Sequence, residues 1–436
     1  MSSIRGERLH LKKQLNNGVN IVYQYLEGYK SVSIGAWIKT GSINETVLNN
    51  GISHFIEHML FKGTKTRTTH DLSQIIDDLG GEINAFTAKD CTCFYTKLLS
   101  EHIETGVELL ADMLSNSTFD ADAIETEKNV IIDEINMYED SSEDVVDDLL
   151  TKVVFGDHPL ALPILGSKET VKNFTRDDLI QYFHEYYQPK QLVISIAGNF
   201  DESEMLALMD KHFGTLENFN DPKPECRSIP KLNYDVIAKE KEIEQVQVSI
   251  DFPGISYEDE RNYEMMLLSN IFGGTNSSML FQTVREKYGL TYSIYSQPSF
   301  YDYVGTMNIT FGASKENLEQ ALNCIVDEIR KLRKKGITKS QIDAGKAHLK
   351  GSFLLGLEGT DHYMDLIGRI ELFNHLEKDV PAMISKIEGI TGETLDTLIQ
   401  HCFGSGHCAM AVVGDVPEET IKMYYHKFNN DLNKLT

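Results

Sequence analysis

The sequence predicts an α+β protein built from two similar domains. Stretches of the first half recur in the second half at a nearly constant distance. Strand-like and helix-like patterns also follow one another in runs, without the strict alternation that a parallel α/β fold would need. The length of 436 residues, with 41% apolar side chains, is enough for two or three domains with sizeable cores.

The internal repeat is visible at two separate places. The amphipathic stretch 101–114 resembles 316–329, at an offset of 215 residues, and the apolar run 192–198 resembles 408–414, at an offset of 216. Amphipathic helices also resemble one another by chance. Two matches at nearly one offset nevertheless favour a duplicated domain of about 200 residues, which is a normal domain size.

A polar segment with three prolines lies between the two copies, from Leu216 to Pro230. Proline and polar residues in this density are typical of a linker. We therefore expect a first domain over residues 1–215, a linker over 216–240 and a second, homologous domain over 241–436.

Both copies contain predicted strands and helices. In the first, the alternating pattern of 31–39 predicts a half-buried strand, Thr69 is expected to cap a helix that ends at Gly80, and the strand-like stretch 82–98 follows. In the second, 245–252 predicts a strand, and 259–272 predicts a helix that ends at Gly273.

The net charge argues against some classes of binding partner. The chain has 41 Lys and Arg against 66 Asp and Glu, a net charge of −25, which repels nucleic-acid phosphates and anionic membranes. It contains no run of 18 apolar residues and begins without an apolar signal segment. The six cysteines form no CxxC pair. We expect a cytoplasmic protein with reduced thiols and with neither nucleic acid nor membrane as a partner.

The strongest chemical signal is the sequence His-Phe-Ile-Glu-His at residues 54–58. His54 and His58 stand one turn apart on a helix, so both imidazoles can reach one ion. Zinc binds imidazole nitrogen and keeps an open position in catalytic sites. Glu57 projects beside them, placed to take a proton from a metal-bound water. Taken alone, the pattern is also compatible with the solvated polar face of an amphipathic helix.

A catalytic zinc needs a third protein ligand, and the predicted helix 122–138 offers one. Glu127 and Glu134 fall on the same face as the apolar residues Ile124, Ile131 and Tyr138. Two carboxylates on a buried face need compensation, which a dication provides. Glu134 would bind the metal, and Glu127 would orient a histidine ligand. Without the histidine motif, a salt-bridged helix edge would be the simpler interpretation.

These motifs resemble the pitrilysin-type inverzincin zinc metallopeptidases, whose signature is HxxEH. The likeness is strongest to the single-chain, roughly half-length bacterial members that are similar to mitochondrial processing peptidase. It covers nearly the whole chain and rests on the following stretches: 51–64, 80–87 and 127–135 in the first half, and 273–278, 280–292 and 349–355 in the second.

The resemblance implies a role for each matching residue. It makes His54, His58 and Glu134 the ligands of one zinc ion per chain, Glu57 the general base and Glu127 the carboxylate that supports a ligand. Asn84 and Ala85 match a strand edge that pairs with the substrate backbone. Arg285 and Tyr292 match a pair near the scissile bond, where Tyr292 would donate to the oxyanion and Arg285 would hold carbonyl groups. Without the family pattern, Arg285 and Tyr292 would be interpreted as an ordinary surface arginine and a strand tyrosine.

The resemblance also implies an architecture and an activity. Each domain would be a mostly antiparallel sheet flanked by helices, and the two would form half of a clamshell chamber that a homodimer closes, with the site shared between subunits. Only residues 1–215 would bind metal, because the second copy has no matching ligands near Ser269 and Gly273. The implied function is a zinc-dependent endopeptidase for short or unfolded peptides. A dedicated precursor-processing peptidase and a non-catalytic binding subunit of the same fold remain alternatives.

Overall fold

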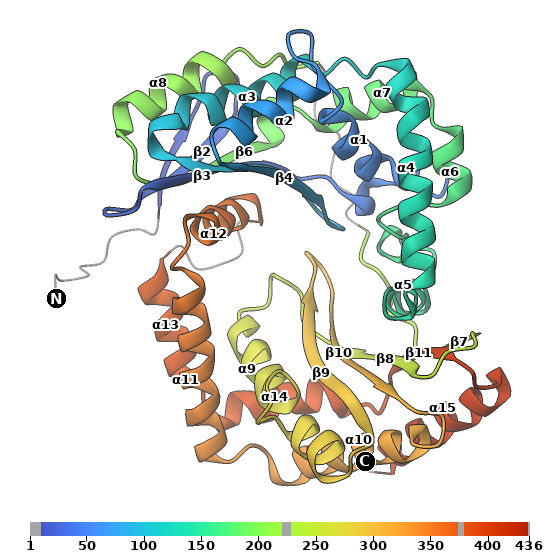
Figure 1. Ribbon diagram of the computed structural model, residues 1–436. Coiled ribbons are helices and arrows are strands. Elements are labelled where there is room, and N and C mark those ends of the chain that lie inside the picture. Colours follow the sequence, from blue (N-terminus) through green and yellow to red (C-terminus); the bar gives the residue numbers. More distant parts are fainter. Residues whose placement is uncertain (1–9, 220–227, 374–378, 435–436) are drawn as a thin grey trace. The chain divides into compact units, whose positions relative to one another are not determined.

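The chain forms two compact units, each with one β-sheet and covering helices (Figure 1). The computed structural model describes residues 10–219, 228–373 and 379–434. Unit 1 comprises Met1–Asn136, Leu162–Arg227 and Leu354–Ala382, and unit 2 comprises Met137–Ala161, Ser228–Phe353 and Met383–Thr436. The predicted α+β class is confirmed.

The sheet of unit 1 has six strands in the order β1-β2-β6-β3-β5-β4. The strands are β1 (Leu11–Gln14), β2 (Asn20–Tyr25), β3 (Ser31–Ile38), β4 (Glu82–Thr87), β5 (Thr92–Leu99) and β6 (Leu192–Gly198). Neighbours are antiparallel except β2 and β6, which run parallel. Strand β4 pairs only with β5 and therefore forms an edge of the sheet.

The sheet of unit 2 has five strands in the order β7-β11-β8-β10-β9. They are β7 (Val236–Glu240), β8 (Val246–Pro253), β9 (Thr291–Phe300), β10 (Gly305–Ala313) and β11 (Ala409–Gly414). Only β7 and β11 run parallel. This is the order of unit 1 without its extra strand β1, and the single parallel pair lies at the same position, so the two units are copies of one fold.

Helices cover the sheet of unit 1 on the face that holds its core. They are α1 (Ile52–Leu60), α2 (Thr69–Asp78), α3 (Ile103–Asn116), α6 (Lys168–Asn173), α7 (Arg176–Tyr186) and α8 (Glu202–Phe213). Figure 1 shows α1, α2, α3 and α8 on one side of this sheet. Buried side chains of the sheet, such as Ile34 and Phe94, pack in one cluster with Phe55, Val107 and Met209 from the helices.

Unit 2 repeats this arrangement with α9 (Asn262–Phe272), the π-helical turn η5 (Phe281–Lys287), α10 (Leu318–Lys335), α14 (Gly392–Phe403) and α15 (Glu418–Asn433). Its core joins Ile250, Ile309 and Val412 of the sheet with Ile325 and Phe403 of the helices. Three more helices contain residues of both units: α4 (Ala121–Asp140), α11 (Lys339–Gly356) and α13 (Val380–Gly389).

Two equivalent helices are exchanged between the copies. Helix α5 (Ser142–Phe155) comes from the first half of the chain but packs on β8 and β11 of unit 2. Helix α12 (Thr360–Phe373) comes from the second half but packs on β2, β3 and β6 of unit 1. The compact units therefore depart from the expected ranges 1–215 and 241–436 in these two segments.

The α12 contact is close because glycines face it. A Cβ atom at Gly368 would lie 2.3 Å from Trp37 Nε1, and one at Gly35 would lie 2.3 Å from Met364 Sδ. Trp37 Nε1 donates to Ser195 Oγ at 2.8 Å, and the Arg369 guanidinium lies 5.3 Å from the Trp37 ring. A side chain at either glycine would push the helix off the sheet.

Several local predictions were wrong. The expected linker 216–240 includes strand β7, and its residues 220–227 lie outside the described part of the chain. The stretch 82–98 is a hairpin, β4 and β5, whose turn is closed by a hydrogen bond from the Ala88 N–H to the Cys91 carbonyl. Thr68, rather than Thr69, caps α2 by accepting from Asp71 N–H. Tyr138, expected in the core stripe of α4, is 39% exposed.

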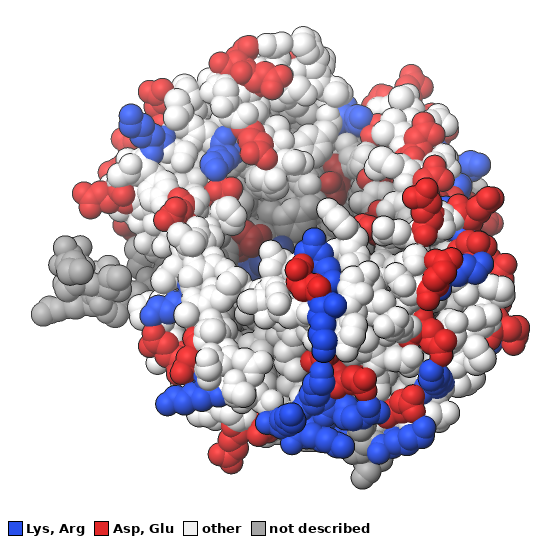
Figure 2. All heavy atoms as spheres, turned by 60° about the horizontal axis from the view of Figure 1, so that its bottom comes forward, with Lys and Arg blue, Asp and Glu red and all other residues white. Residues whose placement is uncertain are grey.

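The surface charge is uneven. Figure 2 shows acidic side chains spread over the face in view, while Lys and Arg gather most densely near its lower edge. Helix α10, for example, ends in Arg333, Lys334 and Lys335 although the chain carries a net charge of −25. Over residues 10–219, 228–373 and 379–434, no helix is both long and apolar enough to cross a membrane.

Candidate metal centre

Helix α1, which carries the HxxEH motif, begins at an unusual cap. Gly51 occupies the left-handed region with φ 93°, and a Cβ atom there would lie 2.6 Å from the Leu165 carbonyl oxygen. The buried carboxylate of Glu45 accepts hydrogen bonds from Gly51 N–H at 2.7 Å and from Ser53 N–H at 2.9 Å. Glu45 thereby satisfies the free N–H groups at the start of the helix and fixes its position.

Three potential metal ligands meet in unit 1. Single ligand atoms of His54, His58 and Glu134 all lie within 4.8 Å of one another. Glu134 Oε2 lies 3.7 Å from His54 Nε2 and 3.5 Å from His58 Nε2. Two ligands of a tetrahedral zinc ion, each about 2.1 Å from it, stand about 3.4 Å apart. The nitrogen and oxygen donors and their separations thus fit a zinc ion. No second cluster of this kind occurs among the described residues.

The two histidines are held differently. His58 Nδ1 lies 2.7 Å from Glu127 Oε1, which leaves Nε2 on the side of Glu134. Glu127 Oε2 in turn lies 2.6 Å from Lys62 Nζ. The buried Nδ1 of His54 has no hydrogen-bond partner among the described residues. Glu127 therefore lies beside a histidine of the motif.

Burial sets the charge of the site. It lowers the pKa of His54 to about 3, helped by the nearby His58, so its ring is neutral at pH 7, the form that binds a metal. Burial alone would raise the pKa of Glu127, but the hydrogen bond from His58 and the ion pair with Lys62 outweigh it, and the pKa lies below its ordinary value. Glu127 is thus an anion that accepts from the imidazole.

Glu57 lies on the same helix and is partly buried. Its Oε2 accepts a hydrogen bond from Thr87 Oγ1 at 2.5 Å. Burial raises the pKa of Glu57, and the hydrogen bond from Thr87 opposes this rise. A carboxylate whose pKa is raised is a stronger base than one with its ordinary pKa.

Asn84 and Ala85, expected at a substrate-binding edge, lie on the edge strand β4. They pair with Tyr95 and Phe94 of β5 on one side, and among the described residues no strand lies on the other. The side chain of Asn84 accepts from the Ala85 N–H at 2.8 Å. A peptide that added to this edge would compete with Asn84 for that amide.

Arg285 and Tyr292 lie together in unit 2. Arg285 belongs to η5 and Tyr292 to β9, and the guanidinium carbon lies 5.5 Å from the tyrosine ring centroid. Arg285 also lies 4.5 Å from the ring of Phe281, one turn earlier. Tyr292 is 76% exposed, so its hydroxyl is accessible.

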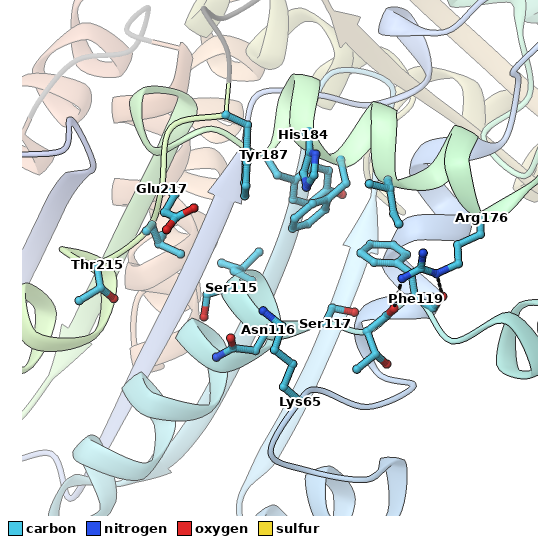
Figure 3. A pocket seen from close by; sticks show the side chains of 16 residues that line it. Lys65, Ser115, Asn116, Ser117, Phe119, Arg176, His184, Tyr187, Thr215 and Glu217 are labelled. Carbon is cyan, nitrogen blue, oxygen red and sulfur yellow. Dashed lines mark hydrogen bonds between the residues drawn. The ribbon is translucent and has the colours of Figure 1, made fainter.

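A cavity of unit 1, with a volume of about 420 Å³, contains none of these residues. It lies between the end of α3, helix α7 and the segment after α8 (Figure 3). Arg176 ties its wall by donating to the carbonyls of Thr118 and Phe119. Its lining offers no set of metal ligands, so we place the candidate site at the histidine cluster on the strength of its chemistry.

Sequence reasoning missed three residues of the site: Glu45, Lys62 and Thr87. Glu45 and Thr87 approach α1 from outside the helix, and no periodicity links them to it. Lys62 did leave a signal, because it follows His58 by four residues and so continues the face of His54 and His58.

Comparison with known proteins identifies the family. Residues 20–168 match the insulinase family (peptidase family M16), and residues 173–349 match the peptidase M16 inactive domain. The uncharacterized zinc protease YmxG of Bacillus subtilis is 40% identical over 404 residues, which are 92% of this chain and 98% of that protein. The uncharacterized zinc protease ML0855 of Mycobacterium leprae is 33% identical over 405 residues, 92% of this chain and 90% of that protein.

Solved structures share the fold. A protease from Helicobacter pylori matches with a TM-score of 0.87 at 22% identity, over 93% of this chain and 99% of that one. A putative M16-like peptidase from Alicyclobacillus acidocaldarius matches with a TM-score of 0.80 at 18% identity, over 93% and 97%. Sequence identity to curated zinc proteases over nearly the whole length, on this fold, shows that the chain belongs to peptidase family M16.

Proposed function

We propose that this chain is a zinc-dependent endopeptidase that cleaves short or unfolded peptides, with one zinc ion held by His54, His58 and Glu134. The observation that carries the proposal is the convergence of these three donors within 4.8 Å, next to Glu57. The curated relatives named as zinc proteases support the choice of metal.

The chain's own residues would divide the chemistry. Zinc, when bound, supplies a Lewis acid that polarises the attacking water and the scissile carbonyl. Glu57 acts as general base, with Thr87 holding Oε2 so that Oε1 can take the proton from the water. Glu57 then delivers this proton to the amine that leaves when the peptide bond breaks.

Substrate binding would use both units. The peptide adds as a strand to β4 beside Asn84 and Ala85, where the backbone edge is unpaired by other strands. Tyr292 donates its hydroxyl to the oxyanion of the tetrahedral intermediate, and Arg285 holds carbonyl groups of the substrate or product. The exposed hydroxyl of Tyr292 and the adjacent guanidinium support this role.

The assembly and location are part of the proposal. We expect a homodimer that encloses a chamber, so that folded proteins are excluded and each site draws residues from both subunits. We also expect a cytoplasmic location. All five described cysteines are unpaired and four of them are buried, as is usual in a reducing compartment.

Two alternatives have different consequences. A processing peptidase would cut one dedicated precursor, and a binding subunit would cut nothing. The match to an inactive M16 domain covers residues 173–349, outside the metal cluster. Because His54, His58, Glu134 and Glu57 are all present, the geometry favours an active enzyme over a binding subunit.

A peptide-library digest distinguishes these three hypotheses. The purified chain is incubated with a mixture of unrelated peptides, with and without a zinc chelator, and the products are identified by mass spectrometry. Cleavage of many peptides that stops with chelator and returns with added zinc supports general peptide turnover. Cleavage at a single motif supports precursor processing. No cleavage by zinc-loaded protein would refute the enzymatic proposal, and a Glu57→Gln preparation controls for contaminating peptidases.

A further inference from the structure

A chain of three side chains leads away from the metal cluster. Lys62 Nζ lies 2.6 Å from Glu127 Oε2, and Glu127 Oε1 lies 2.7 Å from His58 Nδ1. Each oxygen of the carboxylate thus has its own partner, and the two contacts together fix the plane of the carboxylate. That plane decides where His58 Nε2 points.

Because Glu127 is buried, its carboxylate depends on the charge of Lys62. The Glu127 side chain is 2% exposed, so its charge is almost removed from water, while the Lys62 side chain keeps 30% of its surface exposed. A buried carboxylate is stable only when its lone pairs have donors. If Lys62 were replaced by an apolar side chain, Oε2 would lose its donor, and the carboxylate would gain by turning toward water and away from His58.

The backbone after α1 places Lys62 beside Glu127. Lys62 lies just beyond the end of α1, where its N–H donates to the Met59 carbonyl, and Gly63 with φ 110° then turns the chain away. Because Lys62 follows His58 by four residues, its side chain still projects on the face of the two histidines.

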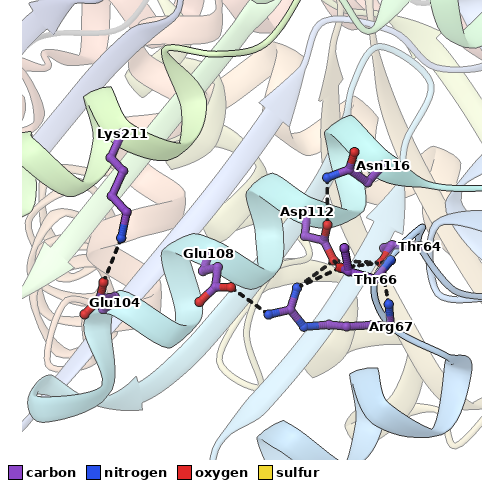
Figure 4. Close-up of polar contacts among 8 residues, drawn as sticks. All are labelled: Thr64, Thr66, Arg67, Glu104, Glu108, Asp112, Asn116 and Lys211. Atoms are coloured by element: carbon purple, nitrogen blue, oxygen red, sulfur yellow. Dashed lines mark hydrogen bonds and ion pairs between the residues drawn. The ribbon is translucent and has the colours of Figure 1, made fainter.

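The segment after Lys62 is anchored on α3 (Figure 4). Arg67 Nη1 lies 2.7 Å from Asp112 Oδ2, and its Nη2 lies 2.7 Å from Glu108 Oε1. Thr64 Oγ1 also donates to Asp112 Oδ2 at 2.7 Å. This network holds the turn after α1, and with it the backbone that carries Lys62.

We propose that Lys62 is a positioning residue of the metal centre, which acts through Glu127 to orient His58 toward the ion. The inference rests on the zinc site proposed above, and it adds a residue that touches neither the metal nor a ligand of it. It predicts that the cation at position 62 matters for how tightly the metal is held.

The test measures zinc affinity rather than peptide cleavage. Wild-type protein and the variants Lys62→Met and Lys62→Arg are titrated with zinc against a competing chromogenic chelator. Met keeps the aliphatic volume of lysine but removes the charge, so we expect the zinc dissociation constant to rise about 10–100-fold, as is typical when a supporting side chain is lost. Lys62→Arg should recover most of the affinity, because a guanidinium can still donate to Glu127.

A matched control uses a lysine on α4, the helix that carries Glu127. Lys128 follows Glu127 in the sequence, and its Nζ pairs with Glu125 Oε1 at 2.7 Å. Lys128→Met should leave zinc affinity unchanged. With cobalt in place of zinc, the visible spectrum of Lys62→Met should differ from that of wild type, while those of Lys62→Arg and Lys128→Met should not. If Lys62→Met does not fold, Lys62→Gln replaces it.

The outcomes separate this inference from the proposed function. Wild-type protein that binds no zinc would refute the metal site itself. Wild-type protein that binds zinc tightly, together with a Lys62→Met variant within about twofold of it, would overturn only the role of Lys62. Equal loss in Lys62→Met and Lys62→Arg would also overturn it, because the effect would then not follow the charge.

Discussion

Thr87 Oγ1 donates a hydrogen bond to Glu57 Oε2 at 2.5 Å, which joins the last residue of edge strand β4 to the metal helix α1. The strand that would receive the substrate and the proposed base are therefore linked by one contact. A peptide that pairs with Asn84 and Ala85 would extend along the strand toward the carboxylate that acts on it.

Removal of this hydrogen bond should slow the reaction without loss of metal. Thr87→Val keeps the shape of the side chain but has no donor, so Glu57 can rotate out of place. Hydrogen bonds to charged groups contribute about 1.5–3 kcal/mol, and we expect kcat to fall roughly tenfold to a hundredfold. The kcat on a fluorogenic peptide and the zinc content are measured together. Thr87→Ser should behave like wild type, and an unchanged kcat in Thr87→Val would argue against the contact.

Glu57→Gln should keep its zinc and lose hydrolysis. Glutamine has nearly the same shape but does not accept a proton at neutral pH, and the loss of a general base costs about 10²–10⁴ in rate. Single-turnover rates and zinc content of the same preparation are the measurements. Activity within a few-fold of wild type would mean that another group takes the proton.

The zinc content should depend on His58 and not on histidines elsewhere. His58→Ala removes one of the three proposed ligands, so we expect the purified variant to hold far less than one zinc ion per chain. His70→Ala, at an exposed position of α2, is the control and should keep full content. Elemental analysis after dialysis decides between them. Full content in His58→Ala would rule out the ligand assignment.

Much of the metal site is predictable because helices impose a simple geometry. The spacing of His54 and His58 places both rings on one face, and the spacing of Glu127 and Glu134 does the same on α4. The structure brings both faces together. Glu45 and Thr87 were missed because their partners are set by tertiary packing, which the spacing of residues does not encode. Lys62 has the helical spacing to His58, but this spacing does not show that its partner is Glu127.

The fold, too, is predictable in part from the sequence. The repeat offset and the alternating strands lead to two similar sheets, and the strand orders, which match except for the extra strand β1, agree with this. The exchange of α5 and α12 was not foreseen, because an amphipathic pattern says that a helix has a buried face but not which sheet will cover it. Strand β7 falls in the predicted linker because five residues beside a proline-rich segment carry little signal.

A buried acid in unit 2 should make stability fall as the pH rises. Burial raises the pKa of Asp251 to about 6 from an ordinary 3.8, although Asn308 Nδ2 donates to it at 3.0 Å. At pH values between these two pKa values, the Asp251 carboxyl therefore keeps its proton in the folded state but has released it in the unfolded state. The contribution of Asp251 to the free energy of unfolding is fully present below about pH 4. It is lost as the pH rises through about 6, by an amount on the order of 3 kcal/mol.

Asp251→Asn should remove this dependence. Asparagine stays neutral and can still accept from Asn308, so we expect the urea midpoint to rise at pH 8 and to rise only about a third as much at pH 4.5. Asp343→Asn, at an exposed position of the same unit, should shift neither midpoint. Equal effects of Asp251→Asn at both pH values would show that Asp251 does not titrate in this range.

The proposed sharing of the site between subunits can be tested by mixing two inactive variants. Tyr292→Phe removes the proposed oxyanion donor and should lower kcat by about 10²–10³ with zinc unchanged. Glu57→Gln removes the base. If the two residues act together across a homodimer, a mixed dimer carries both lesions at one site and none at the other.

Activity should therefore reappear when the two variants exchange subunits. At equal amounts, about half of the dimers are mixed and each has one intact site of two, so about a quarter of wild-type activity is expected. If Glu57 and Tyr292 act within one chain, every chain keeps its own lesion and mixing restores nothing. Subunit exchange is followed separately, by fluorescence transfer between labelled chains. Complete exchange without recovered activity would place the whole site within one chain.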